Sequence, residues 1–75
     1  MDNVNNDILY TVKEVAQILK TNVDYVHKLR KANILPFLKI GQYKVLRTSL
    51  LSFLSAHEGQ DLTNPSDIKE LNQND

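Results

Sequence analysis

Residues 11–32, TVKEVAQILKTNVDYVHKLRKA, carry the strongest structural pattern in the chain. Thr11 and Glu14 have the spacing of a capping box, in which a hydroxyl and a carboxylate satisfy two backbone amides at a helix start. The apolar residues behind that start recur at the helical period of 3.6. They are Val12, Val15, Ala16 and Leu19. The pattern predicts a first helix that ends near Lys20.

A second helix is predicted over residues 23–32. Asn22 is a favourable N-cap, Val26 and Leu29 form the inner edge, and Asn33 can take the left-handed conformation that ends a helix. The outward side chains are those of Asp24, Tyr25, His27, Lys28, Arg30 and Lys31. Two short helices joined by a three-residue turn have the proportions of a helix-turn-helix.

After Pro36 the apolar period changes to two, which indicates a β-hairpin with the two-residue turn Gly41-Gln42. The expected cross-strand pairs are Ile40 with Tyr43, Lys39 with Lys44, and Leu38 with Val45. Like charges that face each other destabilise a sheet. The pairing of Lys39 with Lys44 therefore favours an anionic partner at this position.

A third helix is expected over residues 49–57, capped by Thr48 or Ser49. Its apolar face carries Leu50, Phe53, Leu54 and His57. The predicted fold class is mainly α with a small β-hairpin, in the order helix, turn, helix, hairpin wing, helix. This is the architecture of a winged helix-turn-helix.

Charge and apolar content divide the chain into three segments. Residues 8–57 hold 26 of the 31 apolar residues, and eight basic against two acidic residues give them a net charge of +6. The leader 1–7 and the tail 58–75 are polar and acidic, with net charges of −2 and −4. We expect 8–57 to fold and both ends to lack regular structure. Two alternatives for the tail are a short helix that starts at Asn64-Pro65 and docks on a partner, and an acidic segment that folds over the basic face and weakens nonspecific binding.

The composition argues against several classes of protein. The 75 residues contain no cysteine and two histidines, which excludes disulfides and thiolate metal sites, and we expect no metal and no cofactor. The basic segment has no phosphate-binding glycine loop and no catalytic constellation, so an enzyme is not expected. No apolar run is long enough to span a membrane. The expected protein is soluble and cytoplasmic, with no small-molecule substrate.

The chain resembles the excisionase-type DNA-binding domains related to the MerR group, over about residues 9–55. The matching segments are Leu9–Ala16, Ile18-Leu19, Val26–Lys31, Leu35-Pro36, Ile40-Gly41, Tyr43–Val45, and Leu50 with Phe53-Leu54. The resemblance implies a second helix in the major groove and a hairpin wing against the backbone or minor groove. Proteins of this type occur in bacteria, phages and other mobile elements, where they bend DNA and steer an integrase toward excision, or regulate transcription.

The resemblance implies double-stranded DNA as the partner, together with an integrase or further copies of the chain on tandem sites. The candidate DNA-binding residues are Thr21, Asn22, Tyr25, His27, Lys28, Arg30, Lys31, Lys39, Gln42, Tyr43 and Lys44. Three of them have structural alternatives: Asn22 as a helix cap, Arg30 folded toward the third helix, and Tyr43 covering the core. Lys13 is expected to be a solvated neighbour of Glu14.

Two features depart from the family pattern. The family commonly has glycine where this chain has Lys20, so Lys20 is expected in a strained left-handed conformation. The family also places a basic residue early in the second helix, where this chain has Val23 followed by Asp24. These two residues and the acidic ends support a different hypothesis, a protein-interaction adaptor of the same shape that does not bind DNA.

Overall fold

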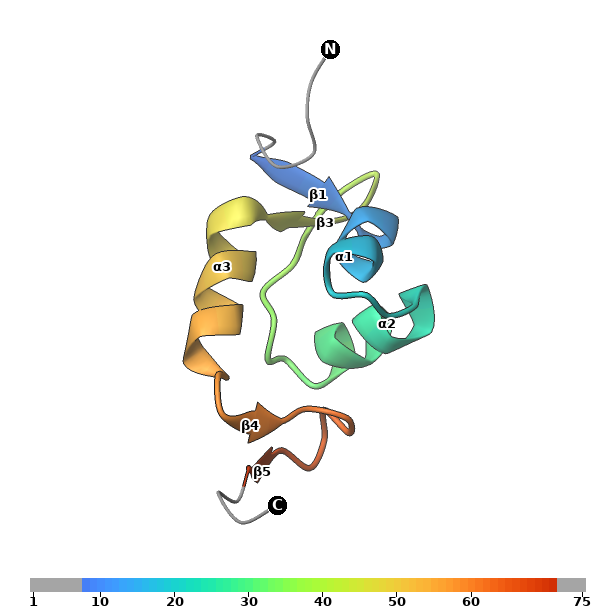
Figure 1. The fold of residues 1–75 in the computed structure, drawn as a ribbon. Helices are drawn as coiled ribbons and strands as arrows, with labels where there is room; N and C mark the ends of the chain where they lie inside the picture. Colours follow the sequence, from blue (N-terminus) through green and yellow to red (C-terminus); the bar gives the residue numbers. More distant parts are fainter. Residues whose placement is uncertain (1–7, 72–75) are drawn as a thin grey trace.

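The computed structural model describes residues 8–71, and Figure 1 shows three helices combined with short antiparallel strands. In chain order the elements are β1 (Leu9–Thr11), α1 (Val12–Ile18), α2 (Val23–Lys31), β2 (Leu38–Ile40), β3 (Gln42–Leu46), α3 (Arg47–Ala56), β4 (Gln60–Asp61) and β5 (Lys69–Glu70). The predicted fold class, with a hairpin wing between the second and third helices, is confirmed. The leader 1–7 and residues 72–75 lie outside the described residues.

The predicted capping box opens α1. Thr11 Oγ1 accepts a hydrogen bond from the Glu14 amide at 3.1 Å, and the Thr11 amide donates to Glu14 Oε1 at 2.9 Å. The helix ends in a Schellman motif, in which the Thr21 amide donates to the Ala16 carbonyl at 2.8 Å. Lys20 provides the left-handed residue of that motif, with φ of 59°. The expectation of a strained lysine in the turn is therefore confirmed.

Both predicted ends of α2 are confirmed to within one residue. Asn22 Oδ1 accepts a hydrogen bond from the Tyr25 amide at 2.8 Å, which satisfies one of the free amides of the first turn. Asn33 follows the helix with φ of 60°. Val26 and Leu29 are completely buried, so they anchor one side of the helix to the core.

The sheet contains a strand that the sequence did not reveal as a partner of the wing. Its strand order is β1-β3-β2, and all neighbours are antiparallel. Tyr10 of β1 lies opposite Val45 of β3, and both side chains are buried. The sequence patterns did not assign residues 9–11 to a sheet. Their pairing with β3 attaches the wing to the start of α1.

The predicted hairpin register is wrong by one residue. Ile40 lies opposite Gln42, so the chain reverses around Gly41, whose φ is 71°, rather than across a two-residue turn. Lys39 consequently faces Tyr43, and Lys44 faces Leu38. The register follows from Gly41, because its positive φ lets one residue reverse the chain, and a shift of one residue exchanges the two faces of β2.

The predicted start and cap of α3 are also wrong. The helix spans Arg47–Ala56, and its N-cap is Leu46, which has no side-chain acceptor. Leu46 is also the last residue of β3 and lies opposite Leu9 in the sheet. The Arg47 amide donates to the Ile8 carbonyl at 2.9 Å, so the neighbouring strand takes the role that Thr48 or Ser49 was expected to play.

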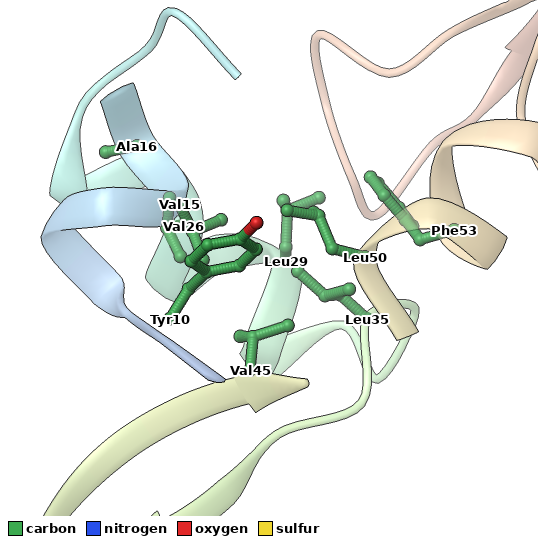
Figure 2. Packing of buried hydrophobic residues seen from close by; sticks show 9 residues of the cluster. All are labelled: Tyr10, Val15, Ala16, Val26, Leu29, Leu35, Val45, Leu50 and Phe53. Atoms are coloured by element: carbon green, nitrogen blue, oxygen red, sulfur yellow. The ribbon is translucent and has the colours of Figure 1, made fainter. Parts of the chain in front are cut away.

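The core is a single apolar cluster to which the three helices and the sheet contribute. Figure 2 shows its side chains converging between α1, α2 and α3. The cluster consists of Tyr10, Val15, Ala16, Val26, Leu29, Leu35, Val45, Leu50 and Phe53. Within residues 8–71, no helix has the length and apolar content that a membrane crossing requires.

The tail, predicted to lack structure, forms a hairpin over its first part. β4 and β5 pair antiparallel, with Asp61 opposite Lys69, and no helix starts at Asn64 within the described residues. Leu62 packs against the core cluster, and Pro65 is buried. The tail itself holds few apolar residues, and the composition therefore predicted no structure there. The segment is held instead by apolar surface that the rest of the chain provides.

Replacing Lys20 with glycine is expected to stabilise the protein by about 1 kcal/mol, because glycine adopts a positive φ without the steric cost that a Cβ imposes. The measurement is the free energy of unfolding in urea. The matched control is Gln17→Gly in the exposed helical part of α1, which should destabilise by a similar amount. A Lys20→Gly variant less stable than the parent protein would contradict the assignment of strain to this turn.

Candidate nucleic-acid interface

The outer face of α2, defined as Asp24, His27, Lys28 and Lys31, points away from the core. Because Val26 and Leu29 are buried, the helical period turns these four positions outward. Asp24, Lys28 and Lys31 are exposed, and His27 is half-buried. Among residues 8–71, neither lysine lies in an ion pair with a carboxylate. Their ammonium groups are thus available to an external anion.

Tyr43 of β3 connects α2 to the wing, defined as residues 38–46. The guanidinium carbon of Arg30 lies 4.2 Å from the centre of the Tyr43 ring, and Lys39 Nζ lies 5.0 Å from it. Both distances are within the range of cation–π interactions. Arg30 thus folds toward the wing and not toward α3, the alternative considered from the sequence. Tyr43 is half-buried and holds one cation from each element.

His27 lies beside this pair and is fixed by Arg30. The Arg30 Nε–H group donates to His27 Nδ1 at 3.3 Å, and the rings of His27 and Tyr43 meet edge to face with centroids 6.2 Å apart. A histidine that accepts at Nδ1 carries its proton on Nε2. His27 therefore retains one N–H donor, which suits an acceptor such as a phosphate or a base edge.

An open groove of about 650 Å³ separates the start of α1, the start of α2 and the wing. Four predicted site residues from α2 and the wing line it: His27, Lys39, Gln42 and Tyr43. Lys13 also lines it, although this residue was expected only to be a solvated neighbour of Glu14. Its position depends on the turn of the wing lying next to the first turn of α1 (Figure 1), and no local pattern in the sequence reveals that proximity.

The other predicted residues lie elsewhere. Lys44 is half-buried between Leu38 and Thr11 of the neighbouring strands, on the sheet face opposite to Lys39. The expected pair of facing lysines is therefore absent from the wing, and only Lys39 belongs to the groove. Asn22 serves as the cap of α2, as its structural alternative proposed.

Tyr25 and Thr21 lie on the opposite flank of α2, where they line a second hollow together with Leu62. The Tyr25 hydroxyl donates a short hydrogen bond to the Leu62 carbonyl. Burial raises the pKa of Tyr25, and the nearby Asp61 carboxylate raises it further. The hydroxyl that was expected to contact DNA is thus engaged with the tail hairpin.

The comparison with protein families gives one match, to the family described as helix-turn-helix domain, over residues 9–58. The match covers two-thirds of the chain and ends just beyond α3. The chain belongs to this helix-turn-helix family. Members of the family bind DNA, so double-stranded DNA is the class of ligand that the match supports. Comparisons with curated proteins and with solved structures gave no match.

The groove is lined by polar side chains that can contact an external ligand. In the described part of the chain, no three His, Asp or Glu side chains gather as a metal ion would require. Two carboxylates adjoin groove residues in sequence: Glu14, which accepts the Thr11 amide in the capping box, and Asp24, which follows Val23. The side chains in the groove bear hydroxyl, amide, ammonium and imidazole groups, which suit acceptor atoms of a nucleic acid.

Replacing Tyr25 with phenylalanine is expected to destabilise the domain by about 1 kcal/mol at neutral pH, because the Leu62 carbonyl loses its donor. The pKa of Tyr25 is raised on folding. The stabilisation that the Tyr25 hydroxyl gives to the folded state is therefore complete below the unfolded pKa of about 10. It is lost as the pH rises through the higher pKa of the folded state. Urea unfolding between pH 8 and 11 tests this. Parallel pH profiles for the two proteins would contradict the assigned hydrogen bond.

Proposed function

We propose that this protein is an excisionase-type DNA-binding protein that inserts α2 into the major groove and places its wing on the adjoining backbone. The observation that carries the proposal is the exposed outer face of α2, with Lys28 and Lys31 unpaired among the described residues and the wing beside it. The major groove of B-DNA is about 12 Å wide and admits a helix. A wing next to that helix meets the backbone that borders the groove.

The proposed contacts divide by position. The major groove of the DNA faces three residues of α2: His27, Lys28 and Lys31. Their imidazole and ammonium N–H groups meet guanine acceptors on the base edges or phosphates at the rim of the major groove. Lys39 and Gln42 of the wing contact phosphates. Arg30 and Tyr43 act mainly by positioning, since each is occupied with the other.

Three predicted residues are given supporting roles in this proposal. Thr21 and Tyr25 lie on the flank that carries the tail hairpin, and Lys44 lies on the outer face of the sheet. None of the three lines the groove, and only Lys44 carries a charge. Neutralising Lys44 is expected to affect affinity less than neutralising Lys39.

The proposed biological role is to bend the DNA of a mobile element and direct an integrase toward excision. The resemblance of residues 9–55 to excisionases supports this role, and the small interface favours further copies on tandem sites or an integrase as partner. A transcriptional regulator would bind in the same way. An excision assay that combines the protein with a candidate integrase and its attachment sites separates the two: stimulated excision supports the proposal, and repression or activation of a promoter without excision supports a regulator.

Replacing Lys28 or Lys31 with alanine is expected to lower duplex affinity and to reduce the slope of log affinity against log salt by about 0.9 for each phosphate that is no longer neutralised. The measurement is a fluorescence anisotropy titration of labelled duplex at several salt concentrations. Lys69→Ala is the matched control, because it removes the same charge from the tail hairpin.

The control should bind with the affinity and salt slope of the unaltered protein. Equal slopes for all three variants would show that α2 does not contact the backbone, and the recognition face would have to be sought elsewhere. Binding by none of the proteins, including the parent, would instead favour the adaptor of the same fold that has no DNA ligand.

A further inference from the structure

The groove between the wing and the first turns of α1 and α2 is lined by positively charged side chains and by no negatively charged ones. Lys13 comes from α1 and Lys39 from the wing, so two separate elements each contribute a cation. All the lining residues are neutral or basic; they are Thr11, Val12, Lys13, Val23, His27, Lys39, Gly41, Gln42 and Tyr43. Two ammonium groups that share a hollow repel each other unless an anion lies between them.

Two polar groups of the groove, those of Lys39 and His27, are held in place before any ligand arrives. Lys39 Nζ lies 5.0 Å from the centre of the Tyr43 ring. His27 Nδ1 accepts from Arg30 at 3.3 Å, which leaves Nε2–H as the donor. Ordered donors lose less conformational entropy on binding than free side chains do. The remaining wall is apolar and comes from Val12 and Val23, which lets the sugar of a nucleotide lie against it.

The shape and the charge together favour one class of ligand. The groove is open along its length and borders the outer face of α2 through His27. If α2 lies in the major groove, the DNA strand that borders this groove passes between α2 and the wing. A phosphodiester carries one negative charge and accepts several hydrogen bonds, which matches two lysines and a neutral imidazole.

We propose that this groove seats a backbone phosphate of duplex DNA and that Lys13 is a direct phosphate contact, together with Lys39 and His27. The inference rests on the proposed DNA-binding function. It adds α1 as a third contributing element besides the recognition helix and the wing. It also explains why an exposed lysine follows the cap of α1, at a position where a helix N-terminus ordinarily favours acidic residues.

The test compares Lys13→Gln with Lys39→Gln and with the control Lys69→Gln, each of which removes one positive charge. Duplex affinity is measured by anisotropy across a salt series. Lys13→Gln and Lys39→Gln are expected to lower affinity about 5- to 10-fold at 0.1 M salt and to reduce the salt slope by about 0.9. The control should change neither. Circular dichroism and thermal unfolding establish that Lys13→Gln keeps the fold, since Lys13 is exposed.

A direct contact is separated from a general charge effect by duplexes that carry a single neutral methylphosphonate. At the phosphate held in the groove, this modification should weaken binding of the parent protein by more than it weakens binding of the Lys13→Gln variant, which has already lost one of the three contacts. Additive losses at every phosphate would overturn the contact. An unchanged Lys13→Gln titration would overturn the inference while leaving the proposed function intact, whereas a parent protein without salt-dependent binding would remove the proposed function itself.

Discussion

Val26 and Leu29 are completely buried beneath α2, and the orientation of every other side chain on this helix follows from that anchoring. The helical period directs Lys28 and Lys31 outward, turns His27 and Arg30 toward the wing, and leaves Tyr25 facing the tail hairpin. A single helix of nine residues thus presents a basic outer face, a flank that packs on the wing and a flank that packs on the tail. Loss of either buried side chain would release all three arrangements at once.

The wing is the second part of the interface, and its position is fixed from two sides. β1 holds β3 through the buried pair of Tyr10 and Val45, while the Tyr43 ring receives Arg30 from α2. The wing therefore cannot move far relative to α2 without disrupting buried apolar packing or the cation–π interaction. Such preorganisation suits a small domain that buries little surface on DNA, because little binding energy is then spent on ordering the protein.

The sequence was most informative where structure depends on neighbouring residues, and least informative where it depends on distant ones. The capping box, the Asn22 cap and the left-handed Lys20 and Asn33 are local and were predicted correctly. The wing register, a local feature, was wrong because Gly41 alone reverses the chain, whereas the cap of α3 was wrong because the distant Ile8 carbonyl replaces a side-chain cap. The tail hairpin and the place of Lys13 in the groove also depend on tertiary contacts. For the same reason, the sequence could nominate the basic residues of the site but could not separate those that share the groove from Tyr25 and Lys44.

In the proposed complex, α2 and the wing together form the DNA-binding surface. The most direct measurement is a titration of isotopically labelled protein with duplex DNA, followed residue by residue through amide chemical shifts. The largest changes should fall on His27, Lys28, Lys31 and Lys39, with small changes in β4 and β5. Changes concentrated on α3 or the tail hairpin, or no saturable change at low salt, would contradict the claim.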